Sequence, residues 1–252
     1  EVAAADTRSV EAMVDVAKGM EPTRGFAAAL RGHQLLQVIS EVKRRSPSKG
    51  ALNADLDPAA LAADYERGGA ACLSVLTDEP HFGGSIADLQ TARAACGLPV
   101  LRKDFTVSER DVLDARLMGA DCVLLIAAAL DRAELLGFHA LATEIGLDVL
   151  VEIHDRDELD KVMAYDVRLL GINNRNLATF ATSLATTEEV VSSLALQPGH
   201  NPVIVSESGL HDGADVSRVR RAGAHAVLVG EALVRAVDPA AKAREMAGAI
   251  AG

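Results

Sequence analysis

The feature that most constrains the fold is an alternation of short apolar runs with helix-length segments, which continues from residue 35 to the end of the chain. An uninterrupted apolar run is typical of a strand buried on both faces, and parallel strands need a crossover helix between them. The pattern therefore predicts eight strands, at Leu35–Val42, Ala71–Thr77, Leu98–Arg102, Asp121–Ala127, Asp148–Ile153, Arg168–Asn173, Pro202–Ser206 and Ala226–Val229.

The segments between these runs carry helix start and stop signals. Ser85 and Ser108 are suited to cap helices, and Asp155 with Glu158 has the spacing of a capping box. Gly-Ala pairs at 69–70, 119–120 and 223–224 each end a helix just before a strand. Eight βα units in one chain of 252 residues indicate an α/β fold of the closed (β/α)8 (TIM) barrel type.

A doubly wound open sheet would show the same alternation. That fold usually has a glycine-rich phosphate loop after its first strand. Here the first strand ends in Glu-Val-Lys-Arg-Arg, and the glycine-rich strand ends come last. We therefore predict the barrel.

The first 33 residues come before any strand. Ser9 can cap a helix that begins at Val10 and stops at Gly19, and Phe26–Leu30 offers a second short helix. We predict a single domain over residues 1–252, in which residues 1–33 form a helical extension and residues 34–252 form the barrel.

Charge and cysteine content limit the classes of partner. A net charge of −11 and a pI near 5.1 argue against nucleic acid or an anionic membrane as a general partner. No apolar run approaches the length of a spanning helix, and no signal-peptide pattern is visible. Three cysteines without metal-binding or CxxC spacing are typical of a reduced cytoplasmic protein. Against this acidic background, the bases Lys43, Arg44, Arg45 and Lys49 suggest a local anion site.

Polar residues stand at the carboxyl ends of most predicted strands, where barrel enzymes build their sites. Glu41 and Lys43 end the first strand at alternate positions, so their side chains point to one face. Further contributions are Lys103 with Phe105 from the third strand, Glu152 from the fifth, Asn173 and Arg175 from the sixth, Glu207, Ser208 and Gly209 from the seventh, and Gly230 with Glu231 from the eighth. The second strand leads to Phe82, which can supply an aromatic wall.

Taken alone, each of these residues would be interpreted as a solvated residue of the barrel rim or of a turn, without a role in a site. Six strands that end in polar residues would, however, bring them to one mouth. His154 follows Glu152 by two positions, and we interpret it as a loop residue, not a metal ligand.

The last two strand ends also suggest a phosphate site. Gly209 and Gly230 allow backbone N–H groups to approach an anion closely, and a short helix follows Gly230. The loops after the seventh and eighth strands are the usual phosphate position in this fold.

Nine motifs in order resemble the indole-3-glycerol-phosphate synthase family, over roughly residues 26–233. They are SEVKR at 40–44, SPSKG at 46–50, SVLTD at 74–78, FGGS at 82–85, LRKDF at 101–105, LVEIH at 150–154, GINNRNL at 171–177, SESG at 206–209 and VGEAL at 229–233. The resemblance implies a (β/α)8 barrel with extra N-terminal helices. It also implies ring closure of 1-(2-carboxyphenylamino)-1-deoxyribulose 5-phosphate, a phosphorylated anionic substrate, with loss of carbon dioxide and water and without a cofactor or metal.

By this resemblance, Lys103 is the general acid, Glu152 is the base, and Lys43 holds or polarises the carboxylate end of the substrate. Glu41 and Asn173 orient the lysines and the substrate hydroxyls, and Ser208 belongs to the same catalytic wall. The resemblance assigns substrate contacts to Ser46, Phe82, Phe105, Arg175, Glu207, Gly209, Gly230 and Glu231. Other enzymes of tryptophan biosynthesis are the expected partners.

Two alternatives remain at this point. A sister barrel, phosphoribosylanthranilate isomerase, shares the phosphate site but is expected to place a cysteine base at the end of the first strand, where this chain has Glu41 and Lys43. A catalytically silent barrel would keep the anion site and lose Lys103 or Glu152.

Overall fold

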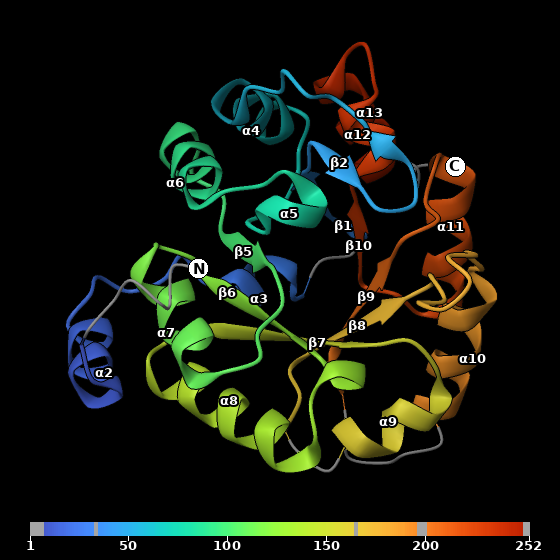
Figure 1. Cartoon of the computed structure of the whole chain (residues 1–252). Helices are drawn as coiled ribbons and strands as arrows, with labels where there is room; N and C mark the ends of the chain where they lie inside the picture. Colours follow the sequence, from blue (N-terminus) through green and yellow to red (C-terminus); the bar gives the residue numbers. More distant parts are fainter. Residues whose placement is uncertain (1–7, 33–34, 164–165, 196–200, 249–252) are drawn as a thin grey trace.

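A closed ring of parallel strands forms the centre of the protein, with helices around it (Figure 1). The computed structural model describes residues 8–32, 35–163, 166–195 and 201–248. Parallel pairing of Gln37–Ser40 with Ala226–Val229 closes the ring, which confirms the barrel and excludes the open sheet. The barrel strands are β1 (Gln37–Val42), β4 (Cys72–Leu76), β5 (Val100–Lys103), β6 (Cys122–Ile126), β7 (Asp148–Ile153), β8 (Leu169–Asn173), β9 (Val203–Glu207) and β10 (Ala226–Val229).

The strands begin and end within about two residues of the predicted positions. The informative differences are at β5 and β9, which extend one residue further, to Lys103 and Glu207. Both residues are still paired in the sheet, Lys103 with Leu76 and Glu207 with Asn173. The apolar pattern stops before these charged residues, whereas the backbone ladder continues through them.

Helices follow the strands and cover the outside of the barrel (Figure 1). They are α4 (Pro58–Arg67), α5 (Glu79–Phe82), α6 (Ile86–Ala95), α7 (Glu109–Leu117), η1 (Ala127–Ala129), α8 (Arg132–Glu144), α9 (Arg156–Val162), α10 (Ala185–Leu194), α11 (Gly213–Ala222), α12 (Glu231–Val234) and α13 (Pro239–Gly248). Ser85 and Ser108 cap α6 and α7 through their side chains, as predicted.

The capping box predicted for α9 is only half formed. The Asp155 side chain accepts from the Glu158 N–H, but the Glu158 carboxylate accepts from the N–H of His154 and not from Asp155. The Glu158 carboxylate therefore binds the residue before the cap instead of the cap residue itself. The reciprocal box is found in α8, between Asp131 and Glu134.

Two helices precede the barrel, as predicted, although residues 1–7 and 33 of the predicted extension lie outside the described residues. Helix α2 (Val10–Lys18) is capped by Ser9 and packs beside α7 (Figure 1). Helix α3 (Phe26–Leu30) places Phe26 and Leu30 in one apolar cluster with inward-facing strand residues such as Ile39. The helix therefore closes the amino-terminal end of the barrel.

The short turn after β1 forms a small hairpin. Arg45–Ser46 (β2) pairs with Gly50–Ala51 (β3), and Gly50 has φ of +67°. Within the described residues, none of the helices is both long and apolar enough to cross a membrane.

Asp121 connects the N-terminal segment to the barrel. Its fully buried carboxylate accepts from the N–H of Arg24 at 2.8 Å, from the N–H of Val100 at 2.8 Å and from the Arg93 guanidinium at 3.0 Å. We predict that Asp121→Ala lowers the free energy of unfolding by about 3–5 kcal/mol, because it leaves the half-buried Arg93 guanidinium and two N–H groups without their acceptor. Urea unfolding measures this loss.

The matched control is Asp166→Ala, which removes a carboxylate whose side chain is 91% exposed. We expect it to change the free energy of unfolding by less than about 0.5 kcal/mol. A similar small loss in Asp121→Ala would contradict the role assigned to Asp121.

Candidate active site

A cleft of about 640 Å³ opens at the carboxyl ends of the barrel strands. The side chains of alternate strand residues point into the barrel, so the last inward position of each strand contributes to the floor or wall of the cleft. The cleft contains every site residue predicted from the sequence, namely Glu41, Lys43, Ser46, Phe82, Lys103, Phe105, Glu152, Asn173, Arg175, Glu207, Ser208, Gly209, Gly230 and Glu231.

Lys103 lies at the centre of a buried charge cluster in this cleft. Its Nζ is 2.7 Å from Glu152 Oε2 and 3.1 Å from Glu207 Oε2, and its side chain is only 14% exposed. Asn173 Nδ2 donates to the other oxygen of Glu152, Oε1, at 3.1 Å. One ammonium group therefore holds two carboxylates that come from different strands.

Burial and charge act in opposite directions on these groups. Burial alone would lower the pKa of Lys103, but the charges of Glu152, Glu207 and Glu41 outweigh it and raise that pKa above its usual range. Burial would raise the pKa of Glu152, but Lys103 and His154 hold it below its usual range. For Glu207, burial dominates and the nearby Glu152 adds to it, which raises the pKa of Glu207 to about 8.

The two carboxylates therefore differ in protonation near neutral pH. Glu152 is ionised, whereas Glu207 retains its proton. Lys103 carries a positive charge, so the resting cluster holds a proton on Lys103 and an ionised carboxylate on Glu152. The cluster thus holds an acid and a base within hydrogen-bond distance of each other.

Two glycines leave room for the carboxylates. A Cβ at Gly230 would overlap with Glu41 Oε2, and one at Gly171 would overlap with Glu207 Oε1. Glu41 in turn forms an ion pair with Lys43 in the same wall. Gly230 therefore has a packing role at this site, separate from the anion-binding role predicted for its backbone.

The rim of the cleft is formed by loops. The Arg175 guanidinium donates to Ser48 Oγ and to the Phe180 carbonyl, both at 3.2 Å, and thereby joins the loop after β8 to the loop after β1. Phe105 is 48% exposed on the opposite rim. Ser208 and Gly209 both have positive φ, at +66° and +76°. The Glu231 carboxylate lies 3.6 Å from Arg235 of the same short helix segment.

Only part of the predicted basic cluster faces the cleft. Lys43 and Lys49 line the cleft, but Arg44 binds Asp88 and the carbonyls of Ala54 and Leu56. Arg45 is exposed, and its side-chain carbons lie against Gly83. Spacing along the sequence could not separate these residues, because the turn after β1 sends neighbouring side chains in different directions.

Sequence analysis did not single out two positions that contact the buried carboxylates. His154 was interpreted as a loop residue; it does follow β7, but its ring is buried against Glu152. Gly171 appeared only within a motif, although it makes space for Glu207. The spacing of Glu152 and His154 could have indicated that their side chains lie together, because residues two apart in a strand share a face. No local sequence pattern marks the space that Gly171 provides.

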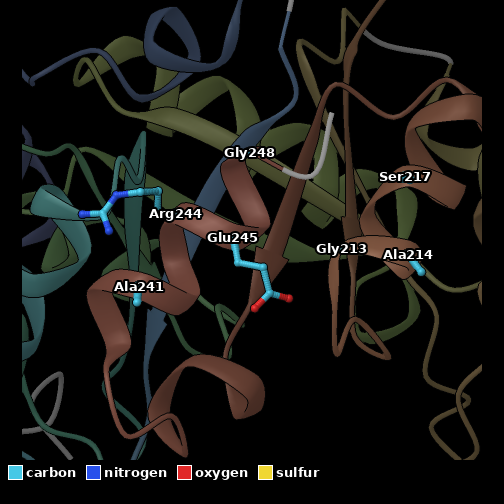
Figure 2. Close-up of a pocket in the computed structure, with 7 residues that line it drawn as sticks. All are labelled: Gly213, Ala214, Ser217, Ala241, Arg244, Glu245 and Gly248. Atoms are coloured by element: carbon cyan, nitrogen blue, oxygen red, sulfur yellow. The ribbon is translucent and has the colours of Figure 1, made fainter. Parts of the chain in front are cut away.

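A second hollow of about 590 Å³ lies between α11 and α13 (Figure 2). Small residues form most of its lining, and its charged side chains are Arg244 and Glu245. Arg244 donates to the Arg67 carbonyl, and Glu245 pairs with Lys242. Both charged groups are thus engaged within the protein, so we place the chemistry in the first cleft.

The fold and the cleft define a (β/α)8-barrel enzyme whose site is built from lysine and glutamate side chains. The sequence matches the indole-3-glycerol phosphate synthase family over residues 1–246. Indole-3-glycerol phosphate synthase from Leptothrix cholodnii is 50% identical over 95% of this chain and 91% of its own length. The Azospirillum brasilense protein of the same name is 47% identical, with the same coverage. The chain therefore belongs to the indole-3-glycerol phosphate synthase family.

Two solved structures share the fold at low sequence identity. A 3-hexulose-6-phosphate synthase has a TM-score of 0.62 and 20% identity, and the match covers 85% of this chain and all of that one. A thiamine phosphate pyrophosphorylase from Pyrococcus furiosus has a TM-score of 0.63 and 14% identity, with 86% and 96% covered. At such identities, these matches establish the barrel architecture alone.

The raised pKa of Glu207 predicts a pH-dependent contribution to stability. The folded protein holds this proton up to about pH 8, whereas an unfolded glutamate releases it near pH 4.5. The associated stabilisation, on the order of 5 kcal/mol, is therefore complete below pH 4.5 and is lost as the pH rises to about 8. Glu207→Gln stays neutral and lacks this dependence.

We would measure urea unfolding of the wild type and Glu207→Gln from pH 5 to 8.5. The stability of the wild type relative to the variant should fall across this range. The control variant is Glu109→Gln, at an exposed position on α7. It measures how the loss of one exposed carboxylate alone changes the pH dependence of the free energy of unfolding. A constant difference between the wild type and Glu207→Gln would contradict the protonated state of Glu207.

Proposed function

We propose that the protein converts 1-(2-carboxyphenylamino)-1-deoxyribulose 5-phosphate into indole-3-glycerol phosphate, with release of carbon dioxide and water. Membership of the indole-3-glycerol phosphate synthase family supports this reaction. The observation that carries it here is the position of Lys103, between Glu152 and Glu207 at the floor of the cleft. Ring closure needs a proton donor, and the later loss of water needs a base.

The cleft suits a ligand with a negative group at each end. Lys43 binds the substrate carboxylate, and the backbone N–H groups around Ser208, Gly209, Gly230 and Glu231 bind the phosphate. Ser46 and Arg175 lie on the rim beside this path, and Phe82 and Phe105 pack against the aromatic ring. This assignment is supported by the presence of all these residues in one cleft.

In our proposal, the ring carbon that bears the carboxylate bonds to the ketone carbon, and Lys103 donates a proton to the ketone oxygen. Carbon dioxide then leaves, which restores the aromatic ring. In the last step the protonated Glu207 gives its proton to the new hydroxyl, which leaves as water, and Glu152 accepts the proton that the adjacent substrate carbon gives up. The resting charges of Lys103 and Glu152 are those that these steps require.

The other polar groups orient this pair. Glu207 and Asn173 hold Lys103 and Glu152 through the contacts at 3.1 Å, and Glu41 holds Lys43. Ser208 completes the wall beside Glu207. Positioning of this kind reduces the entropy lost in reaching the transition state.

We also infer the setting in which the protein works. We propose that residues 1–252 form one domain, with residues 1–33 as its helical extension. Free thiols at Cys72, Cys96 and Cys122 support a reducing cytoplasm. Other enzymes of tryptophan biosynthesis are the proposed partners, since they make the substrate and consume the product.

The direct test follows indole fluorescence after the substrate is added, because the chain contains no tryptophan. Lys103→Ala should lower turnover about 100-fold or more, the scale of a lost general acid. Lys242→Ala, on α13, should leave turnover unchanged. Near-normal turnover in Lys103→Ala would remove Lys103 from its role. Substrate binding by calorimetry without fluorescence in the wild type would indicate a silent barrel.

A further inference from the structure

His154 occupies a buried position behind the candidate base. It directly follows β7, and its side chain is only 9% exposed. Its Nε2 lies 3.2 Å from Glu152 Oε1, and its Nδ1 lies 3.4 Å from Glu158 Oε2. Both are ion-pair contacts without the straight geometry of a full hydrogen bond. The ring therefore lies between a cleft carboxylate and a carboxylate on the helical layer.

The first turn of α9 holds this ring in place. Glu158 accepts from the His154 backbone N–H at 2.9 Å, so one carboxylate contacts both the main chain and the ring of His154. Asp155 accepts from the Glu158 N–H at 3.0 Å and thereby fixes the turn. The imidazole is thus restrained from both sides.

The surrounding charges favour an imidazolium. Glu152 of β7 and Glu158 of α9 face the ring, and Lys103 of β5 contacts the far oxygen of Glu152. Lys161 of α9 directs its ammonium group to the carbonyls of Ala127 and Leu130. Burial would lower the pKa of His154, but the two carboxylates raise it to about 9.

This cation matters most when Lys103 has lost its own charge. In the proposed reaction, Lys103 gives its proton to the ketone oxygen before Glu152 accepts one. During that interval Lys103 is neutral, and His154 is the remaining cation in contact with Glu152 among the described residues. A buried carboxylate without a cationic partner would tend to take up a proton too early.

We propose that His154 is a positioning residue that, as an imidazolium held by Glu158, keeps Glu152 ionised and orients it toward the substrate. His154 is not among the described residues that line the cleft, so it acts on the substrate only through Glu152. This inference rests on the proposed function, because it requires Glu152 to act as the base.

The kinetic test compares His154→Gln and Glu158→Gln with the wild type. His154→Gln removes the charge, so Glu152 should need a higher pH to ionise. We expect the acidic limb of the kcat profile to move up by about one pH unit, so that kcat falls about 10-fold at pH values on that limb, while KM changes less than about twofold. Glu158→Gln should act in the same direction, with a smaller effect.

His139→Gln on α8 and Glu188→Gln on α10 are the matched controls, and both should retain the wild-type profile. An acidic limb that is unchanged in both His154→Gln and Glu158→Gln would overturn the proposal. An equal loss of kcat at every pH would also overturn it, since that would indicate a purely structural role.

Nitrogen-15 NMR of the histidine rings tests the charge without using activity. The His154 signals are identified by their loss in His154→Gln, and we expect an imidazolium at pH 7.5 in the wild type. In Glu158→Gln the His154 ring should titrate at lower pH, and the histidine whose titration moves in this variant identifies His154 even where His154→Gln fails to fold. A neutral ring at pH 7.5 in the wild type would overturn the inference. Absence of turnover in the wild type would instead count against the proposed function.

Discussion

The pairing of β1 with β10 is the constraint on which the rest of the structure depends. Gln37–Ser40 and Ala226–Val229 lie at opposite ends of the sequence, yet their ladder closes the ring. Closure removes the exposed edges of the sheet and brings the carboxyl ends of the parallel barrel strands together around one mouth. It also brings Gly230 beside Glu41, where the missing Cβ leaves room for the carboxylate. The cleft therefore follows from the closure of the barrel.

Inside the ring, an apolar layer supports a charged one. Ile39, Leu101, Leu150 and Val205 fill the middle of the barrel, and each is followed two residues later by Glu41, Lys103, Glu152 or Glu207. Placing such charges in a buried layer is costly unless they are paired. Lys103 offsets this cost for Glu152, and Glu207 avoids it by retaining its proton. The competition among these charges gives the carboxyl groups different protonation states and hence different chemical capacities.

The strands were predictable because burial on both faces leaves a clear apolar signal, and β7 appears at the predicted bounds. The candidate site was predictable because barrels expose the carboxyl ends of their strands, and all predicted residues line one cleft. Arg44 was misassigned because its direction depends on a hairpin and on Asp88, which is distant in sequence. The capping box predicted at Asp155 is only half formed, because the Glu158 carboxylate accepts from His154 instead.

The sequence by itself determined the repeated βα units, the barrel, and the residue types that reach its mouth, because all of these depend on local periodicity. The tertiary structure alone decided which charges meet. The proximity of Lys103 to both Glu152 and Glu207 and the burial of the His154 ring require strands separated by long stretches of chain to pack together. Protonation depends on burial and on the distances between these charges, and neither is encoded in local sequence patterns.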